Sequence, residues 1–114
     1  MVTPAAGAVV LVRFPFPDLS QAKLRPAVAL ADVGRGDWIL CQVTSRPYGD
    51  PQAVEFTDSD FLSGTLQVVS YARPGKLFTA NNTLLAAQVG VLRPESLRDV
   101  VEAIVTILRA SLEQ

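Results

Sequence analysis

The chain has 114 residues and a formal net charge of −1; 49% of its residues are hydrophobic and 18% are charged. This length fits a single domain over residues 1–114, and the composition excludes an intrinsically disordered chain. With no histidine and one cysteine, the sequence excludes a Ser-His-Asp triad, a histidine-ligated metal site and an internal disulfide. No apolar stretch reaches the roughly 20 residues that span a bilayer, and no signal peptide or nucleotide-binding motif is present. We therefore expect a cytoplasmic protein without membrane contact, metal or cofactor.

The first half of the chain predicts three strands. Residues 7–14 are rich in β-branched side chains and end at Pro15, and a loop over residues 14–23 follows. Residues 24–33 are apolar at both alternating sets of positions, which is typical of an interior strand covered on both faces. After a turn at 34–37, residues 37–44 form the third strand, with Cys41 on its apolar face and Thr44 on the opposite face.

The second half predicts shorter strands and then a helix. We expect a loop over 47–52, a strand over 53–57, a turn-rich crossing over 58–64 and a strand over 66–73. After Pro74 and Gly75, an extended segment over 76–79 and a strand around 85–92 follow, although 84–88 also fits a helical turn. Pro94 begins an amphipathic helix to about residue 112, because apolar residues recur there at helical spacing. This order predicts a mainly β (α+β) fold, with a small bent sheet or barrel over residues 7–92.

Charge is segregated along the chain. Residues 12–48 carry five basic and three acidic groups, residues 49–69 carry four acidic groups and no basic group, and residues 70–93 carry three basic groups and no acidic group. If the two basic segments meet in space, they form a face that can bind phosphates. The alternative is a scattered, solvated surface.

Two motifs at predicted strand ends could hold a phosphodiester. Lys23 and Arg25 precede Pro26, which favours an extended backbone at Arg25, and arginine donors match phosphate oxygens. The second motif combines hydroxyl groups and a guanidinium: Thr44, Ser45 and Arg46. Both motifs also fit ordinary surface and turn residues.

A third motif begins at Ser70. Tyr71 and Arg73 share a face and could stack a base and bind a phosphate, with Lys76 following. An ordinary edge strand with cations lying over apolar surface would give the same pattern. Cys41 is expected to be an inert core thiol, and Trp38 to pack in the core or in an interface.

These motifs occur in a recognisable order from residue 7 to residue 108. They are Gly7-x-Val-Val-x-Val, Lys23-x-Arg25-Pro26-Ala27-Val28, Thr44-Ser45, Val69-Ser70, Lys76-Leu77-x-Thr79, and Val89-Gly90-x-Leu92 before a helix. Together they resemble the MazF/PemK family of toxin endoribonucleases, the mRNA interferases of type II toxin–antitoxin systems. The resemblance implies an SH3-like β-barrel of five to seven short strands with a C-terminal helix.

The resemblance also implies an activity and partners. Such a toxin is a homodimer that cleaves single-stranded RNA at short sequences without a metal, by attack of a ribose 2′-OH, and is inhibited by a cognate antitoxin. The family's catalytic arginine and threonine match Arg25 and Thr44. The residues then expected to bind RNA are Lys23, Ser45, Arg46, Ser70, Tyr71, Arg73 and Lys76.

The general base has no candidate in this pattern. The chain has no histidine, and Gly75 stands where some relatives carry an acid. A second interpretation is therefore a diverged, non-catalytic binding module with the same barrel, which acts on a protein target or only on its antitoxin.

Overall fold

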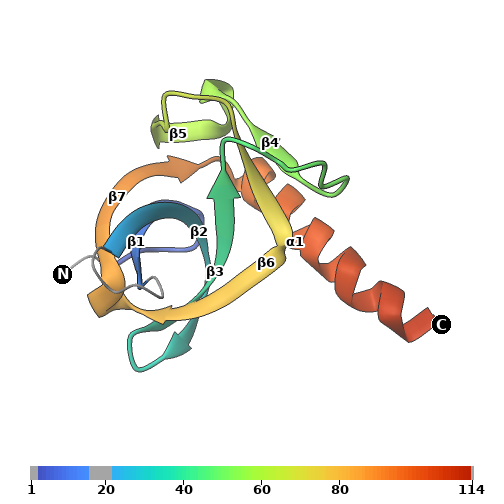
Figure 1. Cartoon of the computed structure of the whole chain (residues 1–114), viewed down its shortest axis with the longest axis horizontal. Helices are drawn as coiled ribbons and strands as arrows, with labels where there is room; N and C mark the ends of the chain where they lie inside the picture. The colour runs from blue at the N-terminus through green and yellow to red at the C-terminus, as the bar shows by residue number, and fades with distance from the viewer. Residues whose placement is uncertain (1–2, 16–21, 114) are drawn as a thin grey trace.

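Seven antiparallel strands form one curled sheet, a half-barrel, and a single α-helix follows at the C-terminus (Figure 1). The structure is a computed structural model and describes residues 3–15 and 22–113. The strands are β1 (Ala8–Pro15), β2 (Ala22–Gly34), β3 (Asp37–Thr44), β4 (Val54–Phe56), β5 (Phe61–Gly64), β6 (Ser70–Asn81) and β7 (Leu85–Leu92). Their order in the sheet is β4-β6-β3-β2-β1-β7-β5. The predicted mainly β fold with a C-terminal helix is confirmed.

Each face of the sheet has its own hydrophobic cluster. The cluster between the sheet and the helix α1 (Pro94–Ala110), here the helix-side cluster, contains Val9, Val28, Cys41, Val43, Phe56, Phe61, Ala72, Leu92, Val100 and Ile104. The cluster on the other face, here the alanine-rich cluster, contains Ala8, Val10, Val12, Ala27, Ala29, Trp38, Leu40, Ala80 and Leu85. Neighbouring residues of β2 enter different clusters, which confirms the prediction of a strand covered on both faces.

The region between β4 and β6 differs from the prediction. Residues 58–64, predicted as a turn-rich crossing, form a short 3₁₀ helix (Asp58–Asp60) and then β5, which pairs with β7. The predicted strand over 66–73 begins only at Ser70, because Gln67 adopts a left-handed backbone with φ of 67°. At the other end of the predicted strand, Pro74 does not end β6. A register shift between Cys41 and Val43, on the partner strand β3, accommodates it, and β6 continues to Asn81.

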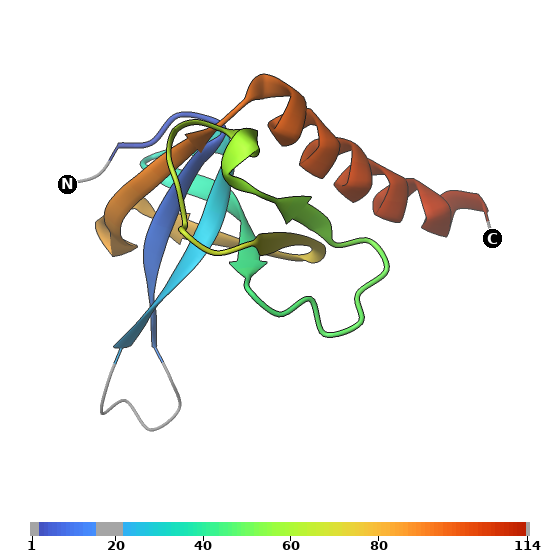
Figure 2. The ribbon, with the colours of Figure 1, turned by 90° about the horizontal axis from the view of Figure 1, so that it is seen from above.

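The helix is confirmed, but its apolar stripe is only partly covered. Ser96, Val100 and Ile104 are buried, whereas Leu108 is 62% exposed. The C-terminal part of α1 extends beyond the sheet (Figure 2). Leu112 lies in a short 3₁₀ helix (Ser111–Glu113) that continues α1. No helix in the part of the chain that the structure describes is long and apolar enough to cross a membrane.

The hairpin of β1 and β2 projects from the body of the sheet on the side away from α1 (Figure 2). The two strands stay paired out to Pro15 and Ala22. Most of the predicted loop over residues 14–23 lies outside the described residues. Arg25 lies in this hairpin, on β2, which also pairs with β3.

Candidate active site

Arg25 and Thr44 lie on neighbouring strands. In the register of β2 with β3, Ala27 is opposite Gln42, and two further residues along this register lead to Arg25 and Thr44. Residues opposite each other in an antiparallel pair present side chains on the same face, with Cβ atoms about 5 Å apart. Arg25 and Thr44 therefore lie at the same end of the β2–β3 pair, two residues beyond its last paired residues, Ala27 and Gln42.

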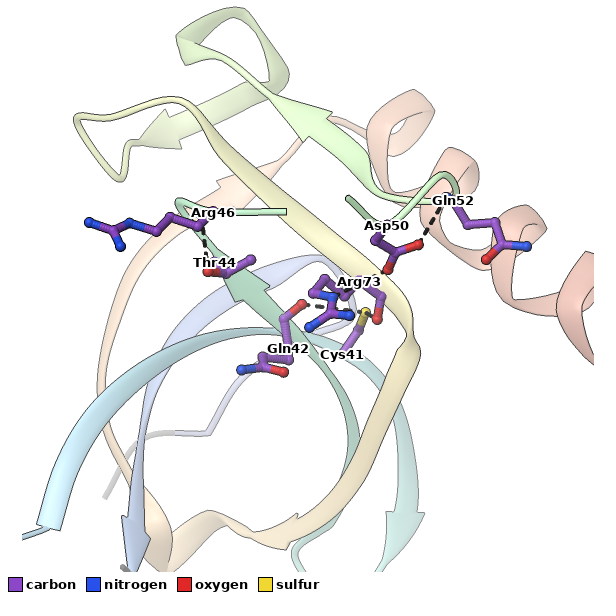
Figure 3. A network of polar contacts seen from close by, with 7 residues as sticks. All are labelled: Cys41, Gln42, Thr44, Arg46, Asp50, Gln52 and Arg73. Atoms are coloured by element: carbon purple, nitrogen blue, oxygen red, sulfur yellow. Dashed lines mark hydrogen bonds and ion pairs between the residues drawn. The ribbon is translucent and has the colours of Figure 1, made fainter. Parts of the chain in front are cut away.

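The chain leaves β3 through a turn that involves the threonine hydroxyl. The backbone N–H of Arg46 donates to Thr44 Oγ1 at 3.1 Å (Figure 3). Such a turn is typical of Ser and Thr, and it fixes the Thr44 side chain at the end of the strand. Ser45 and Arg46 are both exposed, and in Figure 3 the Arg46 side chain extends away from the other labelled residues.

Arg73 is held by the loop that joins β3 to β4. Its Nε donates to Asp50 Oδ2 at 3.2 Å, and its Cζ lies 5.5 Å from the centroid of the Tyr48 ring (Figure 3 shows the ion pair). Tyr48 adopts a left-handed backbone with φ of 55°, which is unusual for a bulky residue. Arg73, which the sequence predicts to bind RNA phosphate, is paired with an acid of the loop that follows Thr44.

Cys41 lies beneath this loop. Its Sγ donates to the backbone carbonyl of Arg73 at 3.3 Å. Burial raises the pKa of the Cys41 thiol to about 12; a backbone hydrogen bond with Arg73 acts to lower this pKa, and the Asp50 carboxylate acts to raise it. Because the thiolate is the nucleophile, Cys41 is inert at neutral pH, in agreement with the prediction of a core thiol.

The other predicted RNA-binding residues have different surroundings. Lys23 and Lys76 are exposed, on β2 and β6 respectively. Ser70 is buried, and its hydroxyl donates to the Val68 carbonyl at 3.1 Å, so it is directed into the protein. Tyr71 is partly exposed and lies directly opposite Thr44 in the register of β3 with β6.

The two basic segments of the sequence do meet, because β6 pairs with β3 and β7 pairs with β1. The acidic segment contributes to the same region, which the sequence analysis missed. Asp50 neutralises Arg73, and Glu55 of β4 is opposite Tyr71. A signal for Glu55 was present, since it is the polar residue between Val54 and Phe56 of a short strand. In the described ranges 3–15 and 22–113, no three His, Cys, Asp or Glu side chains are arranged to hold a metal.

The fold and this geometry can be compared with known proteins. No family model and no curated protein matches the sequence. Solved structures do match. A MazE–MazF complex from Deinococcus radiodurans has a TM-score of 0.76 at 23% identity, with 95% of this chain and 97% of that chain covered. An endoribonuclease in complex with its cognate antitoxin from a mycobacterial species has a TM-score of 0.69 at 19% identity, with 95% of each chain covered.

The likeness extends to free toxins. The Mycobacterium tuberculosis toxin MazF-mt6 has a TM-score of 0.65 at 20% identity, with 85% of this chain and 91% of that chain covered. These matches cover 85–95% of the chain, so they concern the fold as a unit. The chain has the fold of the MazF toxins.

Proposed function

We propose that this protein is the toxin of a type II toxin–antitoxin system and a metal-independent endoribonuclease that cleaves single-stranded RNA. The observation that carries the proposal is the position of Arg25 on β2 and of Thr44 at the end of β3, two neighbouring strands of the sheet. The shared fold with MazF toxins supports it. We assign the protein to the cytoplasm on the same grounds.

The chemistry needs a fixed positive group next to the scissile phosphate. Attack by the ribose 2′-OH on phosphorus builds negative charge on the phosphoryl oxygens, and the Arg25 guanidinium would stabilise this charge. The hydroxyl of Thr44, fixed by the turn at Arg46, would orient the same phosphate. The products are a 2′,3′-cyclic phosphate and a free 5′-OH.

RNA cleavage in the presence of EDTA tests the proposal. A long single-stranded RNA of mixed sequence should be cut at discrete positions, and Arg25→Ala should slow cleavage by about 10²- to 10³-fold, the usual effect of losing one such donor. Thr44→Ala should slow it as well. Arg98→Ala is the matched control, because Arg98 is exposed on α1 and should leave the rate unchanged.

Intact RNA at high concentrations of folded protein would contradict the endoribonuclease proposal. It would favour the second candidate, a non-catalytic binding module. One observation is in its favour: the Arg73 cation is engaged by Asp50 within the protein, which leaves less positive charge for a nucleic acid.

The proposed assembly is a homodimer. Apolar side chains of α1 remain exposed beyond the sheet, and burying them against a second copy would remove this surface from water. The exposed residues are Val101, Val105 and Leu108, with Leu112 in the following turn. Light scattering should give a dimer mass for the natural protein and a monomer mass for Leu108→Glu. A monomer mass for the natural protein at micromolar concentration would contradict this assembly.

The proposed antitoxin binds through an extended acidic segment with apolar anchors. Carboxylates would take the place of RNA phosphates near Lys23 and Lys76, and ordering of the segment would accompany binding. With the protein of the neighbouring reading frame as ligand, calorimetry should show weaker binding for a Lys23→Ala, Lys76→Ala variant. The loss should be larger at low salt, because salt screens exposed charges. Unchanged affinity at low salt would place the antitoxin elsewhere.

A further inference from the structure

A row of four polar side chains crosses four neighbouring strands of the sheet. Thr44 of β3 is opposite Tyr71 of β6, and Tyr71 is in turn opposite Glu55 of β4. On the other side of Thr44, the β2–β3 pairing ends at Ala27 and Gln42, and continuing its register by two residues places Arg25 beside Thr44. The row therefore runs Arg25, Thr44, Tyr71, Glu55 in the sheet order β2-β3-β6-β4.

Burial of the neighbouring residues shows that these side chains share one face. Hydrophobic residues next to the row lie on the helix side: Val43, Phe56 and Ala72 belong to the helix-side cluster, and Val54 packs against it. Because successive side chains of a strand point to opposite faces, Thr44, Glu55 and Tyr71 lie on the face away from the helix. Glu55 is exposed there, so a substrate can reach its carboxylate.

We propose, on the basis of the ribonuclease function proposed above, that Glu55 is the general base that activates the 2′-OH. Cleavage by in-line attack places the 2′-oxygen and the departing 5′-oxygen on opposite sides of phosphorus. The base must then reach the 2′-oxygen from the side away from the 5′-oxygen, and the cation lies beside the non-bridging oxygens. In the row, Glu55 and Arg25 lie at opposite ends, with the hydroxyl groups of Thr44 and Tyr71 between them.

The spacing suits a bound phosphodiester. Neighbouring strands are about 4.8 Å apart, so Glu55 and Thr44 are about 10 Å apart at their Cα atoms. A phosphate seated over Thr44 and Tyr71 has its 5′-side ribose, which carries the nucleophilic 2′-OH, on the Glu55 side.

The Glu55 carboxylate accepts the proton of the 2′-OH while the 2′-oxygen forms its bond to phosphorus and the bond from phosphorus to the 5′-oxygen breaks. Arg25 stabilises the charge on the non-bridging oxygens. The 5′-oxygen takes a proton from water, and the hydroxide so formed removes the proton from Glu55. The products are the 2′,3′-cyclic phosphate and the 5′-OH.

The surroundings leave the Glu55 carboxylate available. The titratable and charged groups facing it come from β6: Tyr71 directly opposite, and Arg73 one diagonal step along the same face. Arg73 is paired with Asp50 at 3.2 Å, so the cation on this face is already neutralised by another acid. Helix α1 packs against the opposite face of β4.

Single-turnover cleavage of a mixed-sequence RNA in EDTA, measured over a pH series, tests this role. Glu55→Gln should slow cleavage by about 10²- to 10⁴-fold, the range for loss of a general base. The rate of the natural protein should fall as the pH is lowered into the range where carboxyl groups are protonated. This fall should be absent from the pH profile of Glu55→Gln. Glu55→Asp should retain part of the rate. Glu102→Gln, an exposed acid on α1, is the charge-matched control and should behave as the natural protein.

A binding measurement distinguishes a general base from a residue that only binds the RNA. A 2′-O-methyl copy of the cleaved RNA cannot react, and Glu55→Gln should bind it at least as tightly as the natural protein does. Full-rate cleavage by Glu55→Gln, or a loss of binding that accounts for its slower rate, would overturn the role of Glu55 while the ribonuclease function stands. If the natural protein leaves RNA intact, the ribonuclease function fails and the role of Glu55 fails with it.

Discussion

The ion pair between Arg73 and Asp50 should stabilise the loop between β3 and β4. The Nε to Oδ2 distance is 3.2 Å, and the side chains are 21% and 12% exposed. At an effective dielectric constant of about 20, unit charges at this separation attract by about 5 kcal/mol, and desolvation cancels most of this. Exposed pairs contribute about 0–1 kcal/mol, and breaking fully buried pairs costs about 3–5 kcal/mol. For this intermediate case, Asp50→Asn should lower the free energy of unfolding by about 1–2 kcal/mol.

Urea denaturation of a double-mutant cycle measures the interaction. With Asp50→Asn, Arg73→Met and the double variant, the coupling energy should be about 1–2 kcal/mol at an unchanged dependence on urea. Asparagine retains the oxygen that accepts the Gln52 N–H at 2.9 Å, so the substitution removes charge and keeps the turn.

A matched control exists at the end of β2. Asp32 accepts the Gly34 N–H at 2.8 Å in the same kind of turn, and among the described residues it makes no ion pair. Asp32→Asn should therefore change the free energy of unfolding by less than about 0.5 kcal/mol. A coupling energy for Arg73 and Asp50 below about 0.3 kcal/mol, or an equal loss in Asp32→Asn, would refute the reasoning.

Three further predictions concern stability. The pKa of the Cys41 thiol is raised from 9.0 to about 12 in the native state. The protonated thiol therefore contributes its full share of the free energy of unfolding below pH 9, and this share is lost as the pH rises from 9 to 12. Above pH 9 the unfolding free energy should fall with pH by about 1.4 kcal/mol per unit more steeply than in Cys41→Ala; equal slopes in denaturation series would contradict this. Gly64→Ala should lower the free energy of unfolding by well over 1 kcal/mol, because a Cβ at this position meets the Val89 carbonyl. Gly34→Ala is the control: its Cβ meets nothing, and its left-handed backbone alone should cost about 1 kcal/mol. Similar urea midpoints for the two variants would argue against the contact at Gly64. Val100→Ala removes two buried carbons and should cost about 2–3 kcal/mol, and a loss below about 1 kcal/mol by calorimetry would show that the helix is not anchored there.

The sequence by itself determined the elements whose signals are local. Alternation along residues 37–44 predicted β3 at its observed bounds, and Pro94 with its apolar spacing predicted the start of α1. The double apolar pattern of β2 predicted a strand covered on both faces. The ordered motifs also predicted Arg25 and Thr44 as partners, and the structure places them on neighbouring strands. These features depend on periodicity and on proline, which act within a few residues.

Only the tertiary structure decided how distant residues meet. A left-handed Gln67 and a register shift opposite Pro74 moved both ends of the predicted strand over 66–73, since pairing with partner strands sets where β6 runs. The partner of Arg73 proved to be Asp50, which lies 23 residues earlier in the chain. Glu55 of β4 lies in one row with Thr44 of β3 because both strands pair with β6. Cross-strand neighbours depend on register over the whole sheet, and a single sequence carries no local signal for register.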